Sequence, residues 1–236
     1  MPVFLIANYY IFIFLLSMNI AHINNYQTFS SIQLYSTELV DKNSAEKKRA
    51  IVYLLEPKDI DNIEAVRNKL ATAPFGEAFL EAFDTTIGIK DNDKVANFAA
   101  KNNKFFVVEI DKDAPFSERL KAFAKATIGF KKVRLETLSS LKDRELGYEN
   151  LRGAGSAILF ALADILSKRE NSGECISLVC PRASKDFYTK SFFKRPPNNA
   201  DNYLELPRDD YEKLKRLLQP KYNIRPLITY NRIQAL

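Results

Sequence analysis

The residues best suited to chemistry in this sequence lie directly before an apolar helical segment. They form a run of small side chains that follows one cation: Arg152, Gly153, Ala154, Gly155, Ser156 and Ala157. Small side chains at the start of a helix let a ligand approach the backbone, where the first amide N–H groups have no partner within the helix. With the helix dipole, these groups favour an anion such as pyrophosphate. The alternative is that the two glycines only shape a tight turn.

Two common phosphate-binding loops do not fit this run. A P-loop ends in Gly-Lys-Ser/Thr, whereas Gly155 is followed by Ser156 and Ala157. A dinucleotide fingerprint needs a third small residue three positions after Gly155, where this sequence has Ile158, and a strand before it, which residues 145–150 do not resemble. A different class of phosphate site is therefore needed.

A second segment, residues 183–193, follows after a helix and a strand and reads ASKDFYTKSFF. Together the two segments resemble the GCN5-related N-acetyltransferases. That family has an Arg/Gln-x-x-Gly-x-Gly/Ala signature, which holds the pyrophosphate of acetyl-CoA, and then an Ala-x-x-x-Phe/Leu-Tyr-x-Lys-x-Gly-Phe segment. The closest match covers residues 133–206. Two positions depart from the family, with Phe192 in place of glycine and Cys180 where asparagine is frequent.

The resemblance implies an N-acetyltransferase that moves acetyl from acetyl-CoA, its co-substrate, directly to a primary amine. It implies cofactor contacts at the strand residues Leu138 and Ser139 and along the run from Arg152 to Ala157. It also implies that Tyr188 is a general acid, because a phenol can protonate the leaving thiolate and such proton transfer contributes ~10²–10⁴-fold. The alternative is that Tyr188 only packs among the neighbouring phenylalanines.

The acceptor amine needs a base, for which Glu136 is the first candidate, since its strand should border acetyl-CoA. Glu145, Glu149 and an ordered water compete with it. A covalent enzyme intermediate is not expected, because Cys180 has no histidine nearby to activate its thiol.

The composition excludes several other chemistries. The 236 residues include one histidine, His22, and two cysteines, Cys175 and Cys180. A Cys/His zinc site needs about four such ligands, so no metal is expected, and a catalytic triad would depend on His22. The cysteines lie on opposite faces of an expected strand, which indicates reduced, buried thiols and a cytoplasmic protein. The net charge of +6 is weak evidence for nucleic acid, and no such partner is expected.

Apolar periodicity predicts alternating strands and helices from about residue 47. Strands are expected at 50–55, 105–110, 131–141, 175–180 and 203–206. Helices are expected at 59–70, 77–83, 93–101, 116–126, 153–166, 184–193 and 208–218. This order indicates an α/β (α+β) domain with a mixed, largely antiparallel sheet flanked by helices. The resemblance makes this an acyl-CoA N-acyltransferase-like fold.

Residues 1–46 are expected to form an apolar N-terminal arm and a linker, and residues 47–236 the N-acetyltransferase-like domain. The arm, residues 3–16, is almost wholly apolar but shorter than the ~20 residues that span a bilayer. It is interpreted as a signal or membrane anchor, as a mis-called start before Met18, or as a packed arm. The polar residues 19–43 indicate a linker with little intrinsic order.

Three functions remain open at this point. The first is the N-acetyltransferase, with a small-molecule, peptide or protein amine as its acceptor. The second is a non-catalytic CoA-binding or interaction module with the same fold. The third is a secreted or membrane-attached interaction protein, in which residues 3–16 would provide any membrane association.

Overall fold

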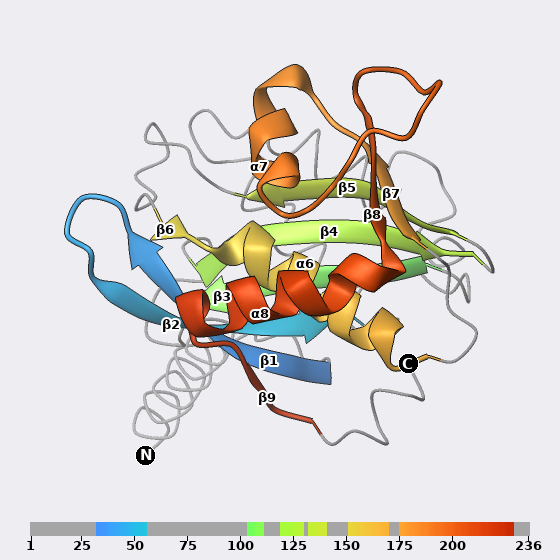
Figure 1. The fold of residues 1–236 in the computed structure, drawn as a ribbon. Helices are drawn as coiled ribbons and strands as arrows, with labels where there is room; N and C mark the ends of the chain where they lie inside the picture. Colours follow the sequence, from blue (N-terminus) through green and yellow to red (C-terminus); the bar gives the residue numbers. More distant parts are fainter. Residues whose placement is uncertain are drawn as a thin grey trace, which may run out of the picture.

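The computed structural model of this chain describes residues 32–55, 103–110, 119–129, 132–140, 151–169 and 175–228. Nine strands of this part form one curled sheet in the order β6-β1-β2-β3-β4-β5-β7-β8, with β9 also paired to β1 (Figure 1). The strands are β1 (Ile32–Asp41), β2 (Lys47–Leu54), β3 (Asn103–Ile110), β4 (Leu120–Ile128), β5 (Lys132–Ser140), β6 (Leu151–Arg152), β7 (Cys175–Val179), β8 (Tyr203–Pro207) and β9 (Arg225–Pro226). Among these nine strands, β5 and β7 are the one pair that runs in parallel.

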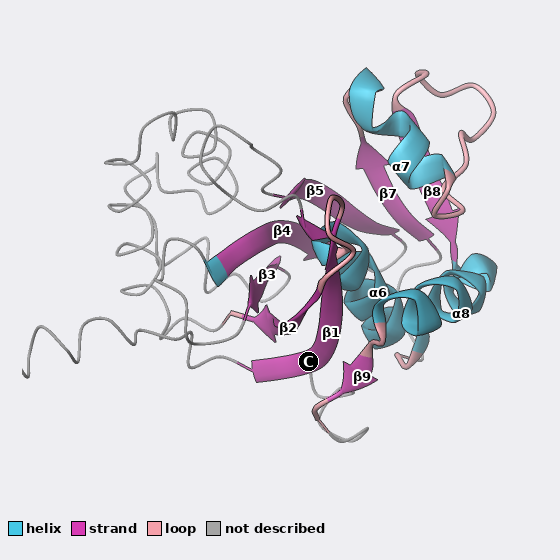
Figure 2. Cartoon of the chain, turned by 90° about the vertical axis from the view of Figure 1, so that its left-hand side faces the viewer, coloured by secondary structure: helices cyan, strands magenta, loops and turns pink. Residues whose placement is uncertain are grey.

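Two long helices cover one face of this sheet (Figure 2). They are α6 (Ala154–Ser167) and α8 (Tyr211–Tyr222), which pack against each other. A short helix, α7 (Lys185–Thr189), follows β7 through the 3-10 turn η3 (Arg182–Ser184), and η4 (Arg208–Asp210) leads into α8. The apolar stripe of α6 packs on alternate residues of the central strands, which form the core with it. The predicted fold class, a mixed and largely antiparallel sheet flanked by helices, is confirmed.

All five expected strands are present, near residues 50–55, 105–110, 131–141, 175–180 and 203–206. The helices expected at 153–166 and 208–218 are also present, as α6 and α8. The expected helix at 116–126 is wrong, because β4 spans Leu120–Ile128. Its alanines share one face with the core, while Lys121, Phe123 and Lys125 alternate onto the other face. Antiparallel pairing with β3 on one side and β5 on the other outweighs the helix preference of alanine.

The expected linker at residues 19–43 is wrong for Ile32–Asp41, which form β1. This strand pairs with β2, β6 and β9, and Leu34 and Leu39 are completely buried. The sheet therefore begins before residue 47, where the sequence placed the start of the domain.

Several expectations fall outside the described residues. These are the arm at 3–16, the helices at 59–70, 77–83 and 93–101, and the two alternative bases, Glu145 and Glu149. Among the helices that the structure does describe, none is long and apolar enough to cross a membrane.

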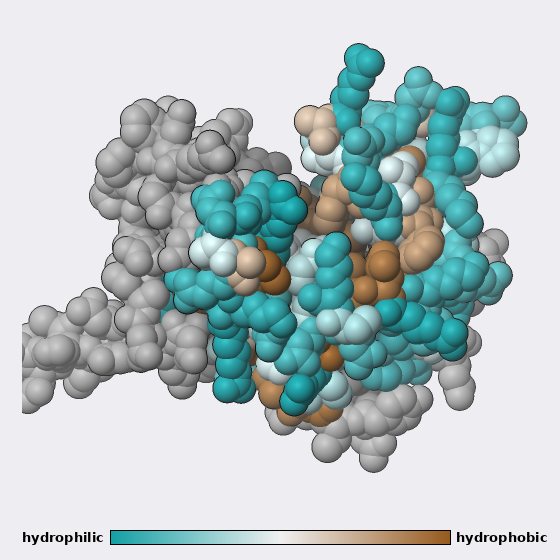
Figure 3. Space-filling model, turned by 60° about the vertical axis from the view of Figure 1, so that its left-hand side comes forward, coloured by the Kyte–Doolittle hydropathy of each residue, from teal (hydrophilic) through white to brown (hydrophobic). Residues whose placement is uncertain are grey.

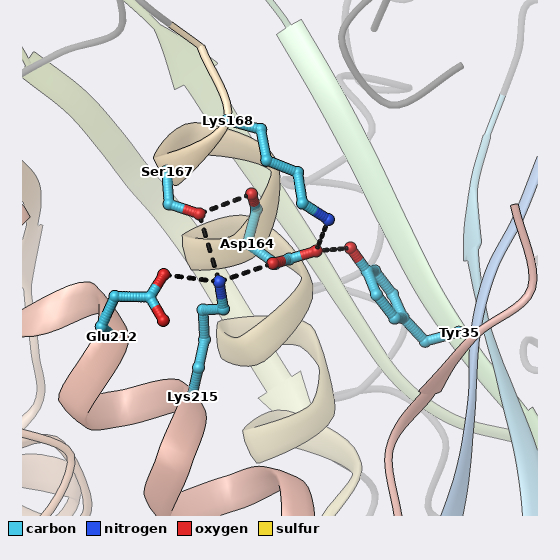
Figure 4. Close-up of polar contacts among 6 residues, drawn as sticks. All are labelled: Tyr35, Asp164, Ser167, Lys168, Glu212 and Lys215. Atoms are coloured by element: carbon cyan, nitrogen blue, oxygen red, sulfur yellow. Dashed lines mark hydrogen bonds and ion pairs between the residues drawn. The ribbon is translucent and has the colours of Figure 1, made fainter. Parts of the chain in front are cut away.

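A buried carboxylate joins α6 to α8 and β1 (Figure 4). Asp164 on α6 accepts a hydrogen bond of 2.5 Å from the Tyr35 hydroxyl and pairs with Lys168 at 2.5 Å and Lys215 at 2.7 Å. Burial alone would raise the pKa of Asp164, but the hydrogen bonds from Lys168, Lys215 and Tyr35 outweigh it and lower that pKa. The ionised Asp164 is thus hydrogen-bonded or ion-paired to β1 and α8 as well as to Lys168 at the C-terminal end of α6. These contacts fix the three elements relative to one another.

Candidate active site

The first feature of the candidate site is the point where β5 and β7 separate. The two strands pair only from Lys132 opposite Cys175 to Arg134 opposite Ser177. Beyond that point β5 contains a β-bulge, because Leu135 and Thr137 pair with consecutive residues of β4 and Glu136 is left as the extra residue. A bulge bends a strand, ends regular pairing and redirects a side chain, which is why bulges occur beside active sites.

The second feature is the start of α6. The short strand β6 pairs Arg152 with Val40 and delivers the chain to Gly153. Gly153 has φ 114°, and a Cβ there would lie 2.6 Å from Cδ1 of Tyr222. Gly153 is therefore needed for the turn and for contact with α8, as the turn-shaping interpretation proposed. The first helical residues, Ala154 to Ser156, are buried, and no N-cap side chain accepts a hydrogen bond from the first N–H groups of the helix.

The third feature is the meeting of the two sequence motifs at Gly155. A Cβ on Gly155 would lie 3.7 Å from Cζ of Phe187 on α7 and 3.8 Å from Cδ2 of Leu138 on β5. The start of α6, the end of β5 and the Tyr188 segment thus converge, although they are far apart in the sequence. Leu138, Phe187 and Phe192 are partly buried against the core. Figure 3 shows apolar side chains in a hollow on the side that carries α7, with hydrophilic side chains around them.

Tyr188 lies on α7 with 6% of its surface exposed. Its ring packs edge-on against Phe187 and Phe193, with centroids 5.0 and 5.5 Å away. Burial, and to a smaller degree the nearby Cys180, raises the pKa of Tyr188 to about 12. The phenol consequently stays protonated at neutral pH and can donate a proton.

Phe192 keeps a backbone conformation that normally belongs to glycine. It has φ 65°, and it ends α7 with two hydrogen bonds, from Phe192 N to Thr189 O and from Phe193 N to Tyr188 O. This pattern is a Schellman motif, in which glycine is favoured at the left-handed position. The contact between the Phe193 and Tyr188 rings completes it. The departure from the family sequence at Phe192 therefore leaves the turn intact, at the conformational cost of a side chain in the left-handed region.

This geometry gives a test by substitution at Phe192. Both Phe192→Gly and Phe192→Ala remove the ring, but only alanine keeps a Cβ at φ 65°. We expect the glycine variant to be more stable than the alanine variant by about 1 kcal/mol, measured by urea unfolding. At the neighbouring Lys190, which is right-handed at φ −66°, the order should reverse. The same order at both positions would contradict the left-handed turn.

Glu136 lies on the other side of the sheet from Tyr188. Its carboxylate pairs with Lys125 at 2.9 Å and accepts a hydrogen bond of 2.7 Å from the Thr127 hydroxyl. Burial raises its pKa, but these two partners outweigh burial and lower it. Lys125 and Thr127 alternate along β4 with Ala124 and Ala126, which face the helices, so Glu136 belongs to the opposite face.

The structure thus brings most of the predicted site residues to one end of the sheet. Leu138 contacts the start of α6, and Ser139 is next to it on β5. Arg152 is exposed, whereas Ala157 is buried inside the helix and its N–H bonds to Gly153 O at 2.8 Å. Glu136 and Tyr188 lie on opposite faces of the sheet, since Tyr188 belongs to the core and Glu136 contacts Lys125 and Thr127. Sequence reasoning missed Lys125 and Thr127 because it placed them on or beside a helix, and it missed Tyr222 because nothing local links α8 to Gly153.

No protein-family model matches the sequence, and no curated protein matches it. Among the solved structures that are similar to it at low identity are the following three. AtaTR bound with AcCoA is 14% identical over 70% of this chain and 97% of its own, with a TM-score of 0.47. A mutant of KacT is 15% identical over 69% and 98%, with a TM-score of 0.47. The PaiA N-acetyltransferase from Thermoplasma acidophilum, in complex with coenzyme A, is 18% identical over 65% and 96%, with a TM-score of 0.41.

Proposed function

We propose that this protein is an acetyl-CoA-dependent N-acetyltransferase that acts on a primary amine. The observation that carries the proposal is the convergence at Gly155 of the small-residue helix start, the end of β5 and the Tyr188 segment. Each motif by itself is weak evidence for an acetyl-CoA site. Their meeting at the separation of two parallel strands is the arrangement that a pyrophosphate-bearing thioester would require.

The residues present fit acetyl-CoA, which would supply the acetyl group as a thioester. No side chain from Gly153 to Ala157 is larger than serine, so an anion can approach the backbone N–H groups at the start of α6. Leu138 and Ser139 border the place where β5 has lost its pairing with β7, and they would contact the rest of the cofactor. Arg152 is exposed beside the helix start and would add a positive charge.

Two residues would move protons in the reaction. Tyr188 holds a proton at its phenolic oxygen, since its raised pKa keeps it neutral, and would give this proton to the leaving sulfur. Glu136 is ionised and would take a proton from the acceptor amine, directly or through water. Because these groups lie on opposite faces of the sheet, the amine would enter from one face while the thiolate leaves toward the other. Direct transfer of this kind needs no covalent enzyme intermediate.

The second candidate function is a CoA-binding module without catalysis. Two observations favour it: Glu136 is already engaged by Lys125 and Thr127, and little of Tyr188 is exposed. A cytoplasmic location remains part of the main proposal.

Acetyl-CoA binding is the first test of both functions. A Cβ at Gly155 meets only ordinary contacts, so Gly155→Ala should fold and be at least as stable as the wild type. Gly155→Val adds bulk between Leu138 and Phe187, where the cofactor would lie. We expect calorimetry to show acetyl-CoA affinity falling from glycine to alanine to valine, by about tenfold or more in total. Unchanged acetyl-CoA affinity in a folded Gly155→Val variant would contradict the assignment of the acetyl-CoA site to Gly155.

A further inference from the structure

A charged groove lies at the other end of the sheet, away from the separation of β5 and β7. Its volume is about 550 Å³. It is lined by residues of β1, β2 and the segment after α8: Ser36, Thr37, Glu38, Lys47, Arg49, Asn223, Arg225, Pro226 and Leu227. A volume of this order accommodates a small organic molecule.

The strand register explains why cationic side chains gather there. Arg49 on β2 is directly opposite Glu38 on β1, and Arg225 on β9 is directly opposite Ser36. Ser36 and Glu38 are two residues apart, so they share one face of β1, and residues paired with them across the strands share that face. Two arginines therefore rise from the strands on either side of β1, with the Ser36 hydroxyl between them.

Glu38, the one carboxylate among the described residues that line the groove, is already neutralised. Glu38 pairs with Lys47 at 2.8 Å and accepts a hydrogen bond of 2.8 Å from the Asn223 amide. The Nε of Arg225 donates a hydrogen bond of 3.0 Å to the Asn223 side-chain oxygen, so the outer N–H groups of this guanidinium can still bind a ligand. Within the part of the chain that the structure describes, the guanidinium of Arg49 has no hydrogen-bond or ion-pair partner. The guanidinium groups of Arg49 and Arg225 thus provide free cationic donors in the groove.

From this arrangement we infer a binding site for a small organic anion that carries at least two carboxylate or phosphate charges. Arg49 and Arg225 would each bind one anionic group through paired N–H donors, and Ser36 would add a hydrogen bond. Pro226 and Leu227 form an apolar wall, and 42% of Leu227 is exposed, so the ligand would also carry an apolar part. Glu38, held by Lys47 and Asn223, would keep both flanking segments in place without repelling the anion.

This site is distinct from the proposed acetyl-CoA site. The groove is lined by residues of β1, β2 and β9, whereas the cofactor would contact β5, α6, α7 and Arg152 of β6. Neither set of residues occurs in the other. An anion in the groove should therefore bind together with acetyl-CoA.

Citrate and inorganic phosphate are suitable probes, because they separate carboxylate recognition from phosphate recognition. We expect at least one of them to raise the Tm of the full chain more than NaCl at equal ionic strength, with calorimetry giving the Kd. The double variant Arg49→Gln/Arg225→Gln should weaken that binding by about tenfold or more. The control Arg216→Gln removes an exposed arginine of α8 outside the groove and should leave binding unchanged.

Saturating acetyl-CoA distinguishes the groove from the start of α6, which could also attract anions. Probe binding that persists with acetyl-CoA present and is lost in the double variant supports the groove. The single variant Arg225→Gln repeats the comparison if the double variant is unfolded by circular dichroism. The inference is overturned if neither probe binds, if the arginine variants bind as tightly as Arg216→Gln, or if acetyl-CoA displaces the probe.

Discussion

Tyr188→Phe should lower kcat by about 10²- to 10³-fold while acetyl-CoA affinity and stability change little. The ring contacts with Phe187 and Phe193 are kept in this variant, since only the hydroxyl is removed. The pKa of about 12 keeps the phenol protonated, so wild-type turnover should retain its acid up to strongly alkaline pH and lose it as the pH rises toward 12. The measurement is steady-state turnover with a competent amine, with single-turnover rates to establish that chemistry limits kcat.

Tyr211→Phe is the matched control for this variant. Tyr211 is fully buried, burial raises its pKa as it does that of Tyr188, and it lies on α8 away from the motifs. Loss of its hydroxyl should leave turnover unchanged. Equal kcat values for wild type and Tyr188→Phe would remove Tyr188 from the mechanism. Acetyl-CoA binding without turnover across a broad amine panel would favour the CoA-binding module.

The helix that would carry the proposed anion site was predictable because its signals are local. A glycine at the turn, small residues in the first turn and an apolar stripe through Leu166 all lie within one segment, and α6 spans Ala154–Ser167. The buried strands could also be recognised from runs of β-branched and aromatic residues, as at β2 and β3. Tyr188 was predictable as a candidate because its motif is contiguous. Its burial and raised pKa depend on contacts that the sequence does not display.

β4 was not predictable from its own residues. The segment from Leu120 to Ile128 is rich in alanine and fits helical spacing at Leu120, Phe123 and Ala124, yet it also alternates with period two. Pairing with β3 and β5 decides between the two patterns, and such pairing is nonlocal. The error also concealed the surroundings of Glu136. Its partners Lys125 and Thr127 become neighbours only when β4 lies beside β5.

β1 was missed for a different reason. Its polar residues, which include Ser36, Thr37 and Glu38, resemble the composition of the preceding segment. The burial of β1 comes from contacts with distant parts of the chain: Thr37 donates to Tyr222 O at 3.1 Å, and Tyr35 donates to Asp164. A linker and an amphipathic strand with such distant partners look alike in one sequence.

The position of β1 reverses what the sequence predicts for N-terminal truncation. A chain that starts at Asn43 should fold if residues 19–43 are a linker, but this deletion removes all of β1. Leu34, Tyr35 and Leu39 are almost completely buried, and burying such a side chain contributes about 1.5–3 kcal/mol. The three together approach the whole stability of a typical domain, about 5–15 kcal/mol. The deletion would also remove the β-pairing partner of β6, which leads into α6, and the hydroxyl that donates to Asp164.

We therefore expect a chain that starts at Asn43 to be unfolded, without a cooperative transition in urea or on heating. The matched control is a chain that starts at Ser30, which keeps every residue of β1. It should unfold cooperatively and bind acetyl-CoA. Circular dichroism and calorimetry on the two chains provide the comparison. A cooperative transition in the shorter chain, with acetyl-CoA affinity equal to that of the longer one, would show that β1 is dispensable and that α6 is positioned without it.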